Sequence, residues 1–220
     1  MVKYSTSEEN YIKSIFHLQQ LDGSVSTNEL ANELKTKPAS VTDMMKKLKA
    51  KKLLNYEPYQ GFRLTTEGNK IALGIIRRHR LWEYFLADKL KFTWDEVHEV
   101  AEELEHITNK KLIDKLDEFL GFPRVDPHGD PIPDNNGKIE TNNSICLTDL
   151  PLNTMAIVSN VNSQSVKILE LLEHKKITIG TKLEVKNKFE FDESMEVRIG
   201  RQPIFSISKQ LAKNIFVTNE

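Results

Sequence analysis

The chain has 220 residues, enough for two or three domains, and its 39% hydrophobic and 29% charged residues are typical of a folded globular protein. A single cysteine excludes an internal disulfide and a zinc site built from several cysteines. No apolar run suits a signal peptide or a membrane span, so we expect a cytoplasmic protein without a membrane partner. The formal net charge of −1 gives no general reason to expect nucleic-acid binding.

Charge is unevenly distributed along the chain. The segment Lys35–Arg63 holds eight basic residues and two acidic ones, a net charge of +6, while acidic residues gather in Asp95–Glu105. A basic segment is usually a solvated surface, so its meaning depends on the elements that carry it.

Three helices are predicted at the start of the chain. Apolar residues from Tyr11 to Phe16 follow helical spacing, and Asp22-Gly23 ends this helix. Ser26 or Thr27 can cap a short second helix, and Pro38 opens a third. The apolar face of the third helix has the spacing i, i+3, i+4 and i+7 and consists of Val41, Met44, Met45 and Leu48.

The other face of the third helix begins with short hydrogen-bonding groups and ends with lysines. In a helix-turn-helix, the second helix places early side chains at base edges in the major groove, while cations hold phosphates. We therefore predict two sets of DNA contacts. Base contacts are expected from Ala39, Ser40, Thr42 and Asp43, and phosphate contacts from Lys37, Lys46, Lys47 and Arg63.

A hairpin follows this basic helix. Leu53–Tyr56 and Phe62–Leu64 alternate like strands and are joined by a loop with Pro58 and Gly61, the pattern of the wing in a winged helix. The order of helix, helix, turn, basic helix and hairpin favours double-stranded operator DNA as a partner over an ordinary solvated surface.

Further helices are predicted downstream of the hairpin. Thr66 can cap a long helix, and Trp94–His106 and Leu112–Leu120 form two others. Their apolar faces exceed what one small bundle needs, so a second face can pack against a twin in a homodimer. The residues of that face are Leu81, Trp82, Phe85 and Leu86, or Leu112, Ile113, Leu116 and Phe119.

The segment Asp126–Gly137, dense in Pro, Gly, Asp and Asn, is the clearest loop and marks a domain boundary. Short alternating apolar runs follow, with one helix that carries Leu169, Leu171 and Leu172. This pattern predicts a small β-barrel. Its strands are expected at Met155–Val158, Lys182–Val185, Met195–Ile199, Ile204–Ile207 and Ile215–Val217.

Histidines and carboxylates recur at helical spacing between the predicted hairpin and the Asp126–Gly137 loop. His79 and Glu83 are four apart, as are His98 and Glu102, and Glu102 and His106, with Glu105 beside the last. Partners at this spacing lie one turn apart on one helix face and can hold one ion jointly. A single such pair is usually a surface feature, but several together favour a metal site.

The strings RRHRLWEYFL, HEVAEELEH and DPHGDPIP, in this order after a winged helix, resemble the diphtheria-toxin-repressor family of metal-dependent transcriptional repressors. The resemblance covers the whole chain. It implies a homodimer that binds operator DNA when loaded with Mn(II) or Fe(II), and that thereby controls metal homeostasis. It also implies that Glu102, Glu105 and His106 belong to one metal site near the start of the first helix, and that a second site includes or borders His79, Glu83 and His98.

Asp126 and His128 stand where some family members take ligands from a Cys-Pro-His loop. Because carboxylate and imidazole replace thiolate here, the chemistry leans toward manganese. Manganese-type members carry acidic ligands at two positions of the first helix, where this chain has Asn10 and Lys13. Glu9 or the amide oxygen of Asn10 could substitute. The region that supplies a further ligand in some members is neutral here, at Asn162–Gln164.

We therefore expect a mainly α protein with small β parts: a winged helix-turn-helix domain at 1–73, a helical metal-binding and dimerisation domain at 74–140 and an SH3-like β-barrel at 141–220. We expect a repressor and not an enzyme. One alternative is a metal-dependent hydrolase that uses the His and Glu cluster, although no nucleophile motif accompanies it. Another is a winged-helix regulator that senses an organic ligand.

Overall fold

The computed structural model describes residues 4–57, 61–140, 143–162 and 165–219. These residues form two compact units. Unit 1 comprises Met1–His79, Leu104–Ile113 and Pro133–Lys138, and unit 2 comprises Arg80–Glu103, Asp114–Ile132 and Ile139–Glu220. The division into domains at 1–73, 74–140 and 141–220 stays a prediction.

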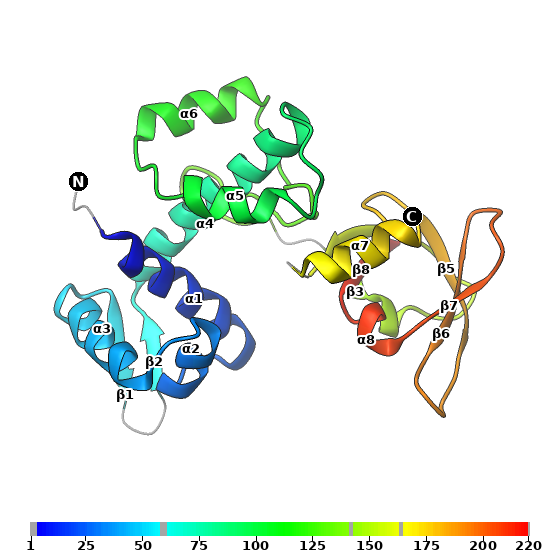
Figure 1. Ribbon diagram of the computed structural model, residues 1–220, viewed down its shortest axis with the longest axis horizontal. Coiled ribbons are helices and arrows are strands. Elements are labelled where there is room, and N and C mark those ends of the chain that lie inside the picture. Colours follow the sequence, from blue (N-terminus) through cyan, green and yellow to red (C-terminus); the bar gives the residue numbers. More distant parts are fainter. Residues whose placement is uncertain (1–3, 58–60, 141–142, 163–164, 220) are drawn as a thin grey trace. The chain divides into compact units, whose positions relative to one another are not determined.

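Unit 1 begins with three helices joined by short loops, followed by a hairpin and most of a long helix (Figure 1). The hairpin strands pair antiparallel, with Leu54 opposite Leu64. The predicted order of helix, helix, turn, helix and hairpin is confirmed, while Pro58 of the expected loop lies outside the described residues. The elements are α1 (Thr6–Asp22), α2 (Thr27–Glu33), α3 (Pro38–Ala50), β1 (Leu54–Glu57), β2 (Gly61–Leu64) and α4 (Thr66–Asp88), which belongs to unit 1 up to His79.

Local sequence sets the helix starts in unit 1. Ser26 caps α2 with its side-chain oxygen, and Pro38 occupies the first turn of α3, both as predicted. The predicted cap of α4 was wrong by one position, because the hydroxyl of Thr65, not Thr66, accepts from Gly68 N at 3.1 Å. Thr66 is instead the first residue of the helix.

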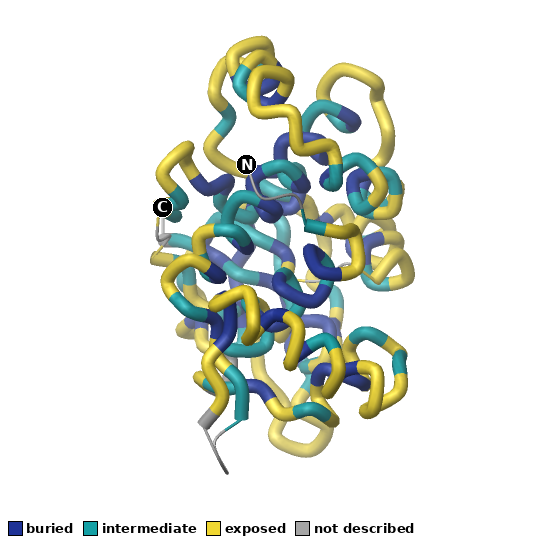
Figure 2. Tube along the Cα trace, turned by 90° about the vertical axis from the view of Figure 1, so that its left-hand side faces the viewer, coloured by how far each residue is buried: buried dark blue, intermediate teal, exposed yellow. Residues whose placement is uncertain are grey.

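The core of unit 1 determines which face of α3 reaches solvent. Val41, Met45 and Leu48 are buried, whereas Met44, predicted with them, is half-buried. They pack with Ile12 and Leu30, both fully buried. Figure 2 shows the resulting alternation of buried and exposed segments along the trace. Because this face is inward, the early polar residues and the lysines of α3 face outward.

Unit 2 combines helices with a six-stranded antiparallel sheet in the order β3-β8-β4-β5-β6-β7. The predicted class, mainly α with small β parts, is confirmed. Its elements after Asp88 are α5 (Val97–Leu104), α6 (Lys110–Phe119), β3 (Ile145–Cys146), η1 (Leu147–Asp149), β4 (Met155–Val161), α7 (Val166–His174), β5 (Lys182–Lys188), β6 (Met195–Ile199), β7 (Phe205–Ile207), α8 (Lys209–Ala212) and β8 (Ile215–Asn219), except that Leu104 and Lys110–Ile113 belong to unit 1.

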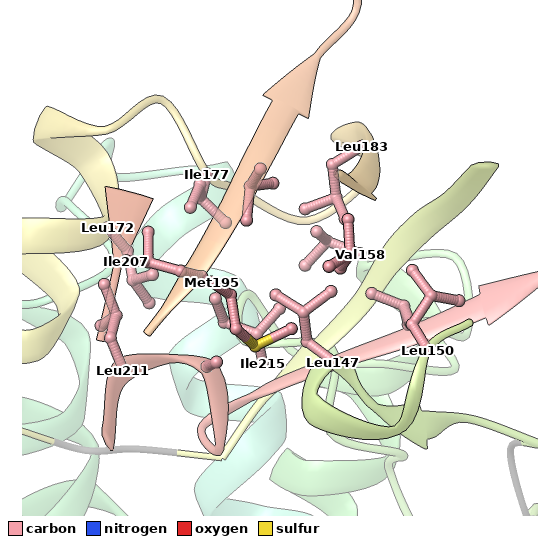
Figure 3. Packing of buried hydrophobic residues seen from close by; sticks show 14 of the residues in the cluster. Leu147, Leu150, Val158, Leu172, Ile177, Leu183, Met195, Ile207, Leu211 and Ile215 are labelled. Atoms are coloured by element: carbon pink, nitrogen blue, oxygen red, sulfur yellow. The ribbon is translucent and has the colours of Figure 1, made fainter. Parts of the chain in front are cut away.

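Apolar side chains from the strands and from α7 and α8 meet in one core. Figure 3 shows Val158, Leu172, Met195 and Ile215 among the side chains that point toward one another there. The predicted helix with the three leucines is α7, but α8 is a second short helix that the apolar pattern did not predict. Trp94, upstream of α5, is half-buried and packs against this core.

The helix predicted at Trp94–His106 is shorter than expected and covers Val97–Leu104. Before it, the carboxylate of Glu96 accepts from Thr93 N at 2.9 Å and holds a turn. After it, the carbonyl of Glu105 accepts from Arg78 Nε at 2.5 Å. Glu105 and His106 therefore follow the helix instead of lying on its face. Within the described residues, no helix combines the length and apolarity of a membrane span.

Candidate metal centres and DNA-binding surface

Glu105 lies at the middle of a polar cluster in unit 1. Its carboxylate is fully buried and contacts Lys13 of α1, with Nζ at 2.8 Å from Oε2 and 2.7 Å from Oε1. His79 of α4 lies with Nδ1 at 2.7 Å from Oε2. We call the cluster of Glu9, Lys13, Arg78, His79, Glu105 and His106 the unit 1 centre.

The second carboxylate of this centre is Glu9 on α1, which is 4% exposed. Arg78 Nη2 donates to its Oε1 at 2.9 Å, and His106 Nδ1 lies 2.6 Å from its Oε2. Two carboxylates are thus each paired with a cation and a histidine. The contacts join α1, α4 and the segment after α5 within unit 1.

The electrostatics of Glu105 follow from these neighbours. Burial acts to raise the pKa of Glu105, but the hydrogen bond with His79 and the charge of Lys13 outweigh it and hold the pKa below its ordinary value. Glu105 is therefore an ionised, acceptor-only group near neutral pH.

His106 contacts the Glu9 carboxylate through Nδ1. In the contact with Glu9 the Nδ1 of His106 donates and the carboxylate accepts, so the tautomer that fits this contact has its lone pair on Nε2. That Nε2 lies 3.8 Å from Glu105 Oε1, a buried oxygen that also lies 2.7 Å from Lys13 Nζ. An imidazole nitrogen beside a carboxylate oxygen is a donor pair that suits a divalent cation, so these residues fit a metal ion.

Asn10 supplies a further observation in unit 1. Its Oδ1 is buried and has no hydrogen-bond partner among the described residues. Such an oxygen is costly unless a donor or a cation reaches it. Asn10 lies beside Glu9 and one turn from Lys13 on α1, so it faces the same side of the helix as Lys13.

A second cluster lies in unit 2. Ligand atoms of Glu83, Asp126 and His128 all lie within 4.8 Å of one another, and all three residues are buried. His98 of α5 lies with Nδ1 at 3.4 Å from Glu83 Oε1 and Nε2 at 3.6 Å from Glu102 Oε1. We call the cluster of Glu83, His98, Glu102, Asp126 and His128 the unit 2 centre.

The tautomer of His128 can be assigned from its partners. Its Nε2 lies 2.7 Å from the carbonyl oxygen of Trp94, which only accepts, so Nε2 carries the proton. Nδ1, at 3.9 Å from Glu83 Oε1, therefore carries the lone pair. A carbonyl that fixes the far nitrogen of a histidine is a common arrangement behind a metal ligand, so this cluster also fits a metal ion.

Asp126 is the most perturbed acid of the unit 2 centre. Burial, with the negative charges of Glu83 and Asp130, raises its pKa well above the ordinary value, although Arg80 opposes this. The Arg80 guanidinium lies 3.5 Å from Asp126 Oδ2. A bound cation would remove this like-charge repulsion, and perturbed carboxylates of this kind are typical of functional sites.

The loop that carries Asp126 and His128 is held tightly. Asp126 Oδ1 accepts from His128 N at 2.8 Å and from Asp130 N at 3.0 Å. Gly129 has φ of +86°, and a Cβ there would lie 2.0 Å from the carbonyl oxygen of Ser159 in β4. No other residue fits this close approach, so the sheet fixes the loop and both candidate ligands.

The structure brings the predicted ligands together within each unit. Glu105 and His106 lie with Glu9 in unit 1, and Glu83 and His98 lie with Asp126 and His128 in unit 2. Predicted combinations that cross the two units, such as His79 with Glu83 and His98, stay predictions. Sequence reasoning missed Arg78, whose only signal was its place next to His79 in an arginine-rich stretch of α4.

The predicted DNA-contacting residues all lie on exposed positions of unit 1. Within α3, Thr42 is tied to its own helix by a hydrogen bond to Pro38 O at 3.0 Å, and Lys46 lies 3.2 Å from Asp43. The full exposed set is Lys37, Ala39, Ser40, Thr42, Asp43, Lys46 and Lys47, with Arg63 exposed on β2.

Glu8, next to Glu9, connects α1 with α3. Its carboxylate is 2% exposed and lies 2.5 Å from Lys51 Nζ and 3.2 Å from Lys47 Nζ. Burial would raise the pKa of Glu8, but hydrogen bonds from Lys51, the Ser5 backbone and Lys47 lower it to about 2. The helix that supplies Glu9 is thus ion-paired to the helix with the predicted DNA-contacting residues.

Family models match three consecutive parts of the chain. They are the iron dependent repressor N-terminal DNA binding domain at residues 3–62, the iron dependent repressor metal binding and dimerisation domain at residues 65–134, and the FeoA domain at residues 145–219. The last covers the predicted SH3-like β-barrel.

Individual relatives agree with these matches. The chain is 32% identical over 120 residues to the HTH-type transcriptional regulator MntR of Oceanobacillus iheyensis, covering 54% of this chain and 81% of that protein. It is 29% identical to the iron-dependent repressor IdeR of Mycobacterium leprae, covering 57% of this chain and 54% of that protein. A manganese-dependent transcriptional repressor solved in complex with manganese is 30% identical, with a TM-score of 0.89 over 97% of this chain and 100% of that one. The chain therefore belongs to the iron-dependent repressor family, the diphtheria-toxin-repressor family of metal-dependent transcriptional repressors, in its long form with a C-terminal SH3-like domain.

Proposed function

We propose that the protein is a homodimeric repressor that binds operator DNA when its two centres hold Mn(II) or Fe(II), and so controls metal homeostasis. The observation that carries this proposal is the buried group of Glu83, Asp126 and His128. Burial and the negative charges of Glu83 and Asp130 raise the pKa of Asp126, and a cation beside these carboxylates would relieve the repulsion.

The donor atoms support this choice of metal. Both centres offer carboxylate oxygens and imidazole nitrogens, and the single cysteine, Cys146, lies in β3 and in neither centre. Oxygen and imidazole donors suit Mn(II) and Fe(II), whereas thiolates would favour softer ions. In unit 1 the ion would be held by Glu105 and His106 with Glu9 or Asn10, and in unit 2 by Glu83, Asp126 and His128 with His98 and Glu102.

The metal supplies positive charge that links separate elements. In unit 1, the candidate ligands come from α1 and from the segment after α5, so an ion favours the arrangement in which both are held together. A ligand shifts a conformational equilibrium only by its preference for one state. Glu8 and its contacts with Lys47 and Lys51 extend this restraint from α1 to α3.

Exposed apolar residues support a second copy of the chain as a partner, and exposed polar and basic residues support DNA as a partner. Phe119 and Phe122 are 65% and 64% exposed and lie in the part matched by the dimerisation model. Two copies would present two α3 helices, as palindromic operators require. In each copy, base contacts are assigned to Ala39, Ser40, Thr42 and Asp43 of α3. Phosphate contacts are assigned to Lys37 before α3, to Lys46 and Lys47 on α3, and to Arg63 on β2.

The test is DNA binding titrated separately with Mn(II), Fe(II) and Zn(II). The probe is a duplex selected from a random pool by the Mn(II)-loaded protein, and the variants are Glu102→Ala and His106→Ala. Matched controls are Glu99→Ala, exposed on α5, and His174→Ala, exposed on α7. We expect the controls to keep metal-dependent binding and the two variants to lose it.

Three other outcomes would contradict the proposal. If the protein bound no divalent metal, a regulator that senses an organic ligand would replace it. DNA binding that ignores metal would remove the switch. If both Glu102→Ala and His106→Ala kept metal-dependent binding, the assigned ligands would be wrong.

A further inference from the structure

Lys13 occupies the position where a metal ion would approach Glu105. Its Nζ lies 2.7 Å from Glu105 Oε1, the same oxygen that lies 3.8 Å from the Nε2 of His106. The Lys13 side chain is 13% exposed and that of Glu105 is fully buried, so water screens this ion pair weakly. A divalent ion shared by Glu105 and His106 must therefore either displace the ammonium group or bind beside it.

Both routes weaken metal binding. Displacement breaks an ion pair with a buried carboxylate, and the ammonium group must then reach solvent along its flexible stem. Binding beside it places a divalent ion next to a positive charge, which repels it. Removing the charge of Lys13 relieves either cost.

The same contact also stabilises the metal-free arrangement. Lys13 joins α1 to Glu105 and Arg78 joins α4 to Glu9, so each carboxylate of the unit 1 centre already has a cation. His79 also hydrogen-bonds to Glu105, and His106 to Glu9. These contacts already hold α1 against the segment after α5 in the metal-free protein, so a metal ion adds to an existing restraint.

We propose that Lys13 is a tethered cation that competes with the divalent metal ion for the Glu105 carboxylate and sets how much metal the unit 1 centre requires. This inference rests on the proposed metal-dependent function. It makes Lys13 a positioning residue with two effects of opposite sign: it holds α1 in the metal-free protein, and it lowers the affinity of the centre for metal.

The experiment compares wild type, Lys13→Met and Lys13→Arg in the full-length protein, with Lys70→Met, exposed on α4, as a surface control. Calorimetry with Mn(II) alone gives the affinity, and amide hydrogen exchange of α1 in chelator gives the metal-free arrangement. In Lys13→Met we expect about tenfold tighter Mn(II) binding and about tenfold faster exchange in α1. Lys13→Arg and Lys70→Met should resemble wild type in both measurements.

A purely structural role would speed exchange without tightening metal binding. Unchanged or weaker Mn(II) binding by Lys13→Met, with normal binding by wild type, would therefore overturn this inference alone. No Mn(II) binding by wild type would overturn the proposed function as well. If Lys13→Met does not fold, Lys13→Gln, which keeps a hydrogen-bond donor without the charge, is measured in the same way, with the same outcomes deciding.

Discussion

The two centres contain the same kinds of side chain but differ in how their charge is balanced. In unit 1, Lys13 and Arg78 lie against Glu105 and Glu9, and the pKa of Glu105 is lowered. In unit 2, burial and neighbouring carboxylates raise the pKa of Asp126 despite Arg80. The carboxylates of the first centre already have cations against them, whereas in the second centre a bound cation would offset the repulsion among the carboxylates. The same ligand types can therefore lie in different electrostatic surroundings, and we expect the two centres to respond differently to metal.

The largest effect should come from removing the charge at the middle of the unit 1 centre. Glu105→Gln leaves Lys13 without its buried ionic partner and weakens the contact with His79. Breaking a buried pair from one side costs about 3 kcal/mol. Urea unfolding of the metal-free protein, with Glu99→Gln as the control, measures this loss. A loss no larger than in the control would show that the ion pair does not hold unit 1.

The corresponding change in unit 2 should have the opposite character. Asp126→Asn keeps an oxygen that can accept from His128 N and Asp130 N but removes a charge that Glu83 repels. We expect Mn(II) affinity to fall by about 100-fold, while the metal-free protein is at least as stable as wild type. Calorimetry with Mn(II) and urea unfolding in chelator measure the two quantities.

A matched control exists for this substitution. Asp134 accepts from backbone N–H groups two and four residues later, as Asp126 does, yet it is exposed and outside both centres. Asp134→Asn should leave metal binding unchanged. If Asp126→Asn lowered metal-free stability while Asp134→Asn did not, the buried charge would be stabilising, and the contrast between the centres would be wrong.

The sequence predicted most of the framework but little of this contrast. Spacing within α3, the proline at its start and the alternating runs of the sheet are local signals, so they predicted elements correctly. The end of α5 at Leu104 was not predictable, because Arg78, distant in the chain, bonds the carbonyl of Glu105. Lys13 was recognised as a departure from the resemblance, but its pairing with Glu105 depends on tertiary contact. Sequence spacing indicates which ligand types exist, not which cations lie against them.

Acid should affect unit 1 through Glu8. Because its pKa is lowered to about 2 in the folded protein, Glu8 contributes stability above its ordinary pKa of 4.5, and this contribution is lost as pH falls from 4.5 toward 2. Lys47 is 54% exposed, and solvent screening reduces the effect. We expect Glu8→Gln to cost about 1 kcal/mol at pH 7 and almost nothing near pH 2.

The contribution of Asp126 to the pH dependence of stability has the opposite sign, since its raised pKa disfavours the folded state as pH rises. Urea unfolding of wild type and Glu8→Gln across this range, in chelator, tests the assignment, and a difference independent of pH would contradict it.

The smallest expected effect concerns the DNA-facing side of α3. Lys46 contacts the exposed Asp43 at 3.2 Å, a surface pair worth little, so its ammonium group remains available to a phosphate. Lys46→Ala should weaken binding of the Mn(II)-loaded protein by a few-fold on every sequence and reduce the slope of log affinity against log salt by about one.

Ser40→Ala, a change at a predicted base contact, should instead alter sequence preference while leaving the salt slope unchanged. Binding measured at several salt concentrations on the selected duplex and on a scrambled one separates the two variants. If Lys46→Ala left the salt slope unchanged, the lysines of α3 would not contact the DNA backbone. Because neither residue belongs to a metal centre, Mn(II) affinity should be the same in both variants as in wild type.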